Sequence, residues 1–143
     1  MFKIIQLSLA LVISVLIITL LSEVIEFISI LLISNESANQ LSTSPHLFYK
    51  IRNSFDFLIY KAFYSFFACL IGGYVGTWIF DSNEKLVSIL IITFYGIILY
   101  STLIIGSKNF LPPIEYSIIL FICSSSAIYI GSQIRKHKAP VSL

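Results

Sequence analysis

Charged residues divide the chain into long uncharged segments and short polar ones. Asp, Glu, Lys and Arg are excluded from four mainly apolar runs of 19 to 22 residues, at 4–22, 62–80, 86–107 and 116–134. An α-helix rises about 1.5 Å per residue, so roughly 20 residues cross a hydrocarbon core about 30 Å thick. Stretches such as Leu16-Ile17-Ile18 are continuously apolar, so the runs lack the alternation of a membrane-spanning β-strand. The pattern predicts an all-α, integral membrane four-helix bundle that forms one domain over residues 1–143.

The predicted elements follow these runs closely. The spans are expected at about 4–22, 57–80, 86–107 and 114–134, with an outer loop at 34–45 and a tail at 135–143. Apolar residues 27–33 follow Glu23 and Glu26, so the first helix either ends near residue 22 or continues as far as residue 33. A cleaved signal peptide is the less favoured alternative, because the apolar run exceeds about 7–15 residues and no A-x-A site follows it.

An amphipathic segment lies between the polar stretch that ends at Pro45 and the second span. At helical spacing, its apolar positions form one face, and its polar positions form the opposite face. This segment either lies in the outer interface or prolongs the second span as one long helix. Because no helix breaker separates Leu58 from the span, we expect the continuous helix. The apolar face consists of Leu47, Phe48, Ile51, Phe55, Leu58 and Ile59, and the polar face of Lys50, Asn53, Ser54, Asp56 and Lys61.

The composition agrees with a membrane protein. Apolar residues make up 57% of the chain and charged residues 11%, with a mean hydropathy of +0.95, whereas soluble domains carry roughly 25% charged residues. The net charge of +2 argues against nucleic-acid binding, which requires a basic stripe. No P-loop, dinucleotide fingerprint or Ser/His/Asp arrangement occurs. We therefore expect no enzymatic activity, no catalytic residue, no cofactor and no bound metal, and the lipid bilayer as the main partner.

Lys and Arg near the span ends indicate the orientation in the membrane. Four spans place both termini on the same side of the bilayer. That side would hold five basic residues and the other side four, so the bias predicts cytoplasmic termini. The basic cluster that follows the last span is expected to act as a stop-transfer anchor. The first group is Lys3, Lys85, Arg135, Lys136 and Lys138, and the second is Lys50, Arg52, Lys61 and Lys108.

Small residues recur at every fourth position on two spans. They are Ala68, Gly72 and Gly76 on the second span, and Cys123, Ala127 and Gly131 on the fourth. Stripes of this kind allow helix backbones to approach closely in lipid. We expect them to serve packing within the bundle, with a homo-oligomer contact as the alternative.

Glu23 and Glu26 form an acidic pair three residues apart, on one face of the first helix. Acidic residues inside a span are costly and are usually functional. The 19 uncharged residues before Glu23 already cover the hydrocarbon core, so one interpretation places the pair in the headgroup region. In the other interpretation the helix continues to Ile33 and the pair faces the bundle. There it binds a cation or a proton, or pairs with Lys61 or Lys108.

The remaining reactive side chains are scattered. Cys69 and Cys123 lie inside the second and fourth spans without a C-x-x-C partner, so we expect buried thiols, with a contact between them left open. His46, Lys108 and Glu115 fall on the outer side in the predicted topology. These side chains lack a recognised metal-ligand spacing.

The layout resembles a group of small bacterial four-span proteins with no assigned activity. Members have a glutamate at the end of the first span, an outer segment with a proline, a G-G-x-x-[GA] motif and a proline loop before the last span, which closes with a glycine. The matching residues are Glu23, Pro45, Gly72-Gly73-Tyr74-Val75-Gly76, Pro112-Pro113 and Gly131. A histidine associated with the loop before the last span is replaced here by Pro112. The resemblance implies a location in the bacterial inner membrane and implies no activity.

Three functions remain open from the sequence. The favoured one is a non-enzymatic structural, accessory or assembly component that packs against itself or against a larger membrane protein. The second is a small transporter or channel-like protein in which Glu23 and Glu26 form a cation or proton site. The third is a membrane enzyme that acts at the outer face through His46, Glu115 and Lys108.

Overall fold

The computed structural model describes residues 2–34, 45–105 and 114–138, and every regular element among them is an α-helix. The helices are α1 (Phe2–Ser34), α3 (Pro45–Arg52), α4 (Phe55–Ile79), α5 (Glu84–Ile105) and α6 (Ile114–Lys138). Four of them, all except α3, are long and apolar enough to cross a membrane. The prediction of an all-α bundle with four membrane-spanning helices is confirmed.

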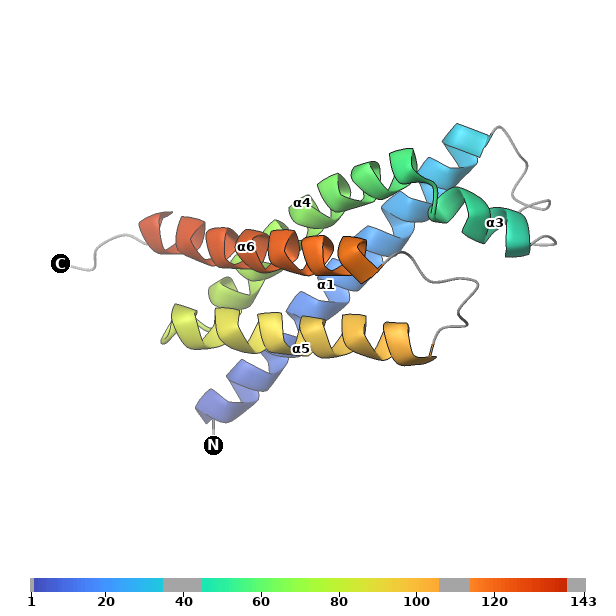
Figure 1. Ribbon diagram of the computed structural model, residues 1–143. Coiled ribbons are helices and arrows are strands. Elements are labelled where there is room, and N and C mark those ends of the chain that lie inside the picture. The colour runs from blue at the N-terminus through green and yellow to red at the C-terminus, as the bar shows by residue number, and fades with distance from the viewer. Residues whose placement is uncertain (1, 35–44, 106–113, 139–143) are drawn as a thin grey trace.

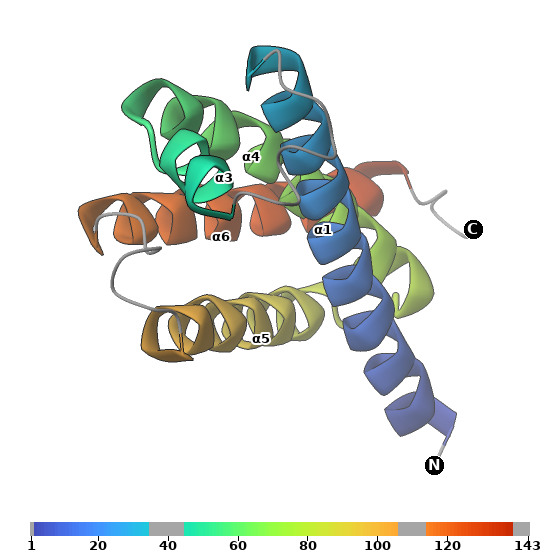
Figure 2. The same ribbon diagram turned by 90° about the vertical axis from the view of Figure 1, so that its right-hand side faces the viewer.

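The bundle is organised around the pair α4 and α6, which run in the same direction and have the most extensive contact among the described helices. Helix α1 packs against α4 and crosses the bundle obliquely, while α5 packs mainly against α6 (Figures 1 and 2). The start of α1 and the end of α6 lie at the same end of the bundle. Helix α3 lies at the opposite end, beside the end of α1 and the start of α4.

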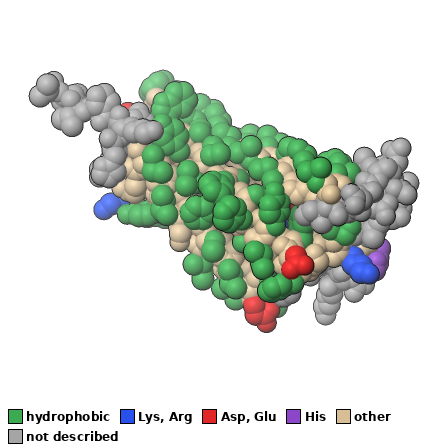
Figure 3. Space-filling view, turned by 90° about the horizontal axis from the view of Figure 1, so that it is seen from above, with side chains coloured by type: hydrophobic (Ala, Val, Ile, Leu, Met, Phe, Trp, Pro, Cys, Tyr) green, Lys and Arg blue, Asp and Glu red, His purple; other side chains and the backbone are tan. Residues whose placement is uncertain are grey.

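The outer surface is hydrophobic and many polar side chains are inside, as expected for a protein surrounded by lipid. Figure 3 shows hydrophobic side chains spread over most of the face in view. Large side chains such as Leu16, Phe63 and Ile97 are more than half exposed. Buried Ser14 and Thr77 donate hydrogen bonds to carbonyl groups one turn earlier, Ala10 at 2.7 Å and Gly73 at 3.0 Å. Such bonds satisfy hydroxyl groups where water is scarce.

Two glycines bring the backbones of α4 and α6 into contact. A Cβ atom on Gly73 would overlap the carbonyl oxygen of Ile128, and one on Gly131 would overlap that of Leu70. The predicted stripe on α4 faces a different helix, because a Cβ atom on Gly72 would meet the side chain of Ile18 in α1. Of the predicted packing residues, Ala68, Gly72, Gly76, Ala127 and Gly131 are buried and Cys123 is partly buried.

The predicted continuous helix from the amphipathic segment into the second span is wrong. The helix breaks at Asn53 and Ser54, and Ser54 has an extended backbone with φ −67° and ψ 146°. Its hydroxyl donates to the carbonyl oxygen of Ile51 at 2.8 Å, and its backbone N–H donates to the same oxygen at 3.0 Å. Serine forms such local bonds in competition with the helical pattern. The break gives α3 and α4 independent directions.

The break also changes which apolar residues are buried. Phe48 and Ile51 of the predicted face pack with buried Ile30 and Phe57. Phe55 and Ile59, predicted on the same face, are 78% and 59% exposed.

The structure also shows where α1 and α6 end. Helix α1 continues past Glu23 and Glu26 to Ser34, which is the longer of the two alternatives. Helix α6 continues to Lys138, so part of the expected tail is helical. Residues 35–44, which make up most of the expected outer loop, and 139–143 lie outside the described residues.

Candidate functional site

Glu26 is the centre of a buried ion-pair cluster at the α3 end of the bundle. The residue is only 2% exposed. Its Oε2 atom lies 2.6 Å from Nζ of Lys61 and accepts a hydrogen bond of 2.8 Å from the hydroxyl of Tyr64. Its Oε1 atom is paired with Nε of Arg52. One carboxylate from α1 therefore binds two cations and a tyrosine that come from α3 and α4.

Local structure explains how these side chains meet. Lys61 and Tyr64 are three residues apart on α4, so they lie on the same face of that helix. Arg52 is the last residue of α3, whose position is fixed where Phe48 and Ile51 pack against Ile30 and Phe57. The aromatic ring of Tyr49 lies 6.0 Å from the Arg52 guanidinium carbon, which adds a cation–π contact.

Glu23 has a very different environment, although it is less than one helical turn away. Its side chain is 72% exposed, and its Oε1 atom is 4.0 Å from the Arg52 guanidinium, at the limit of an ion pair. Such exposed pairs contribute little to stability. The spacing of Glu23 and Glu26 predicts one candidate site formed by both residues, but the structure places only Glu26 inside the bundle.

The charges of the cluster balance. Arg52 and Lys61 supply two positive charges, and Glu23 and Glu26 supply two negative ones, and all four residues lie outside the uncharged runs 4–22 and 62–80. An isolated charge in this position would be costly, whereas paired and hydrogen-bonded charges are tolerated. The arrangement joins α1, α3 and α4 through one carboxylate.

The geometry limits what Glu26 can bind. A carboxylate has about four acceptor positions, and three of the Glu26 positions face Arg52, Lys61 and Tyr64. A metal or other cation would have to displace one of these groups. In the described parts of the chain, no group of three or more His, Cys, Asp or Glu residues is placed to hold a metal ion.

The sequence predicts one of the three partners of Glu26. Lys61 was one of its two predicted alternatives, and Lys108, the other, lies outside the described residues. Arg52 and Tyr64 were missed. Tyr64 lies three residues from Lys61 on α4, and this spacing could have indicated that both side chains face Glu26. The position of Arg52, in contrast, depends on the break that separates α3 from α4.

The other reactive positions that the structure describes are not part of this cluster. His46 on α3 and Glu115 on α6 are both exposed, and Lys108 is not described. Cys69 and Cys123 are free thiols. Cys69 is buried in the middle of the bundle, where it interacts with Tyr95 of α5 and Ser124 of α6.

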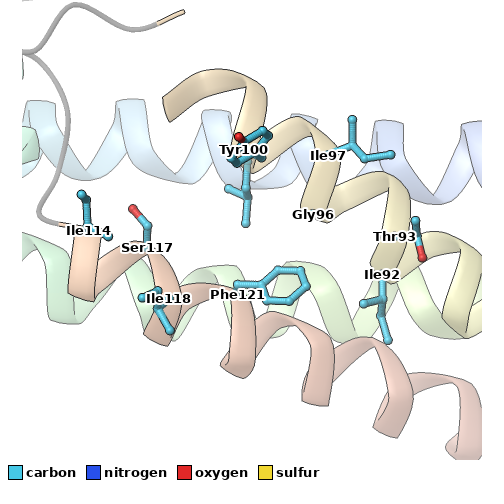
Figure 4. Close-up of a pocket in the computed structure, with 10 residues that line it drawn as sticks. Ile92, Thr93, Gly96, Ile97, Tyr100, Ile114, Ser117, Ile118 and Phe121 are labelled. Atoms are coloured by element: carbon cyan, nitrogen blue, oxygen red, sulfur yellow. The ribbon is translucent and has the colours of Figure 1, made fainter. Parts of the chain in front are cut away.

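A groove of about 570 Å³ runs between α5 and α6, and none of its lining residues belongs to the charge cluster. The ring of Phe121 extends from α6 towards Gly96 of α5, and both residues line the groove (Figure 4). Because the groove is almost entirely apolar and lies between two membrane-spanning helices, it offers surface to lipid rather than groups for chemistry. Its lining also includes Ile92, Thr93, Ile97, Leu99, Tyr100, Ile114, Ser117 and Ile118.

Replacement of Tyr64 by phenylalanine tests the hydrogen bond to Glu26. We expect Tyr64→Phe to lower the free energy of unfolding by about 1.5 kcal/mol, because the bond has a charged acceptor and is buried. Unfolding in mixed micelles measures this change. Tyr60→Phe is the matched control, since Tyr60 is 44% exposed on the same helix. Equal effects of the two substitutions would contradict the assigned role of the Tyr64 hydroxyl.

No protein-family model matches the chain, and no curated protein or solved structure is significantly similar to it. The resemblance described from the sequence therefore depends on its own short motifs.

Proposed function

We propose that this protein is a non-enzymatic structural, accessory or assembly component of a membrane. The observation that supports this most directly is the Glu26 carboxylate, whose partners are Arg52, Lys61 and Tyr64 of the same chain. A site that binds and releases an ion needs accessible ligands. Here the buried carboxylate instead fixes α3 onto α1 and α4.

The setting we propose is the bacterial inner membrane, with both termini in the cytoplasm. The outer surface of apolar side chains supports a lipid environment. The basic cluster at Arg135, Lys136 and Lys138 supports the orientation. A homo-oligomer or a larger membrane-protein partner would contact the apolar outer faces of the helices.

A small transporter or channel-like protein is the second candidate. It is supported by the burial of Glu26, at 2% exposure, in a helix long enough to span the membrane. Buried ionisable groups of membrane proteins often belong to ion or proton pathways. In such a protein the ion pairs of Glu26 would have to open during each cycle.

Proteoliposome flux separates the two candidates. We expect the reconstituted protein to conduct protons and monovalent cations no faster than protein-free vesicles, because the Glu26 carboxylate is held by internal partners. A pH-sensitive dye in the vesicle lumen, with an imposed proton or K⁺ gradient, measures the flux. A flux that persists in Glu23→Gln and is lost in Glu26→Gln would overturn the structural role and support the transporter.

A further inference from the structure

The Glu26 carboxylate has acceptor capacity that its ion pairs and hydrogen bond leave open. Oε2 is occupied by Lys61 and Tyr64. Oε1 is ion-paired with Arg52, but it is fully buried and accepts no hydrogen bond from the described part of the chain. Buried carboxylate oxygens in proteins almost always accept hydrogen bonds from protein groups or from ordered water.

Tyr116 supplies the complementary group. It lies near the start of α6, at the end of the bundle that holds the cluster, and its hydroxyl oxygen is fully buried. Among residues 2–34, 45–105 and 114–138, no group forms a hydrogen bond with this hydroxyl. Tyr116 nevertheless interacts electrostatically with both Glu26 and Arg52. The Tyr116 hydroxyl and Oε1 of Glu26 are thus a buried donor and a buried acceptor at the same end of the bundle, and neither has a hydrogen-bond partner among the described residues.

We propose that a single water molecule binds between the Tyr116 hydroxyl and Oε1 of Glu26. The water would accept the Tyr116 O–H and donate one hydrogen bond to Oε1. Bound waters in protein interiors typically make two to four hydrogen bonds with polar groups that have no other partner. This site does not depend on the function proposed above, because it follows from the unsatisfied atoms alone.

The bound water assigns a positioning role to Tyr116. The direct partners of Glu26 come from α3 and α4. A water bridge adds α6, so that four helices at this end of the bundle share one carboxylate. It also gives the buried carboxylate contact with a molecule that exchanges protons.

A double-mutant cycle on the full-length protein tests the link between Tyr116 and Glu26. We expect Tyr116→Phe to lower the folding equilibrium constant about tenfold in the wild-type protein and less than about twofold in a Glu26→Gln background. Tyr129→Phe is the control, because Tyr129 is 49% exposed on the same helix and its effect should be equal in both backgrounds. Equal effects of Tyr116→Phe in the two backgrounds would overturn the proposal.

A structure of the wild-type protein in nanodiscs, at a resolution that shows water, decides how the two groups are joined. The proposal requires a density peak within hydrogen-bonding distance of both oxygens, and loss of that peak in Tyr116→Phe. Direct contact of the Tyr116 hydroxyl with Glu26, or absence of a peak between them, would overturn the water site. This readout needs no folded Glu26→Gln protein.

Discussion

Glu26→Gln is expected to lower the free energy of unfolding by about 3 kcal/mol, the largest effect that we expect of any charge substitution among the described residues. The substitution leaves Arg52 and Lys61 partly buried without their carboxylate. Their side chains are 27% and 16% exposed, so they retain some access to water, and the lower end of the usual ~3–5 kcal/mol range applies. Unfolding in mixed micelles and the amount of protein in membranes measure the effect.

Glu23→Gln is the matched control for this experiment. It makes the same chemical change on the same helix, but Glu23 is 72% exposed and 4.0 Å from Arg52, so we expect a loss below about 0.5 kcal/mol. A second substitution, Lys61→Met, should recover part of the stability lost in Glu26→Gln, because it removes one of the unpaired cations. Equal losses in Glu23→Gln and Glu26→Gln would contradict the ion-pair cluster.

Gly73→Ala and Gly131→Ala are expected to destabilise the bundle by about 1–3 kcal/mol each, or more. The new methyl groups would overlap the carbonyl oxygens of Ile128 and Leu70, which are backbone atoms and cannot rotate away. The α4 and α6 backbones would have to move apart along their main contact. Helix propensity alone favours alanine over glycine by about 1 kcal/mol, so a net loss identifies the packing contact as its cause.

Gly96→Ala is the control for the packing experiment. Its methyl group would lie 2.8 Å from the Phe121 ring, a side-chain contact next to the groove between α5 and α6. The ring can turn into the groove, so we expect a change within about 1 kcal/mol of zero. A larger loss in Gly96→Ala than in Gly73→Ala or Gly131→Ala would show that backbone contact between α4 and α6 is not the tightest constraint in the bundle.

The glycines show what the spacing of small residues can predict about helix packing and what it cannot. The spacing of Ala68, Gly72 and Gly76 indicated a close helix contact, but it did not indicate which helix makes it. In the structure a Cβ on Gly72 would meet α1, whereas the neighbouring Gly73, outside the stripe, meets α6. Adjacent residues on a helix point about 100° apart, so the two glycines serve different partners.

A local hydrogen-bonding interaction also breaks the helix that the amphipathic pattern between Pro45 and Lys61 predicts. The helical spacing of the apolar positions predicted one continuous helix, but the helix breaks where Ser54 forms hydrogen bonds to Ile51. Periodicity reports which residues prefer burial, but it does not register a competing side-chain bond. Without that break, Arg52 would belong to the same straight helix as Lys61 and would not approach Glu26 from a separate element.

The sequence by itself determined the four membrane-spanning helices. Uncharged runs of 19 to 22 residues match the thickness of a bilayer, and charges are too costly to place within them. The tertiary structure alone decided the difference between Glu23 and Glu26. The two residues have the same chemistry and lie on the same helix, but only Glu26 faces the point where α3 and α4 meet. The environment of a carboxylate is set by residues that are distant in sequence, so the positions of Arg52, Lys61 and Tyr64 made one glutamate a buried centre and left the other exposed.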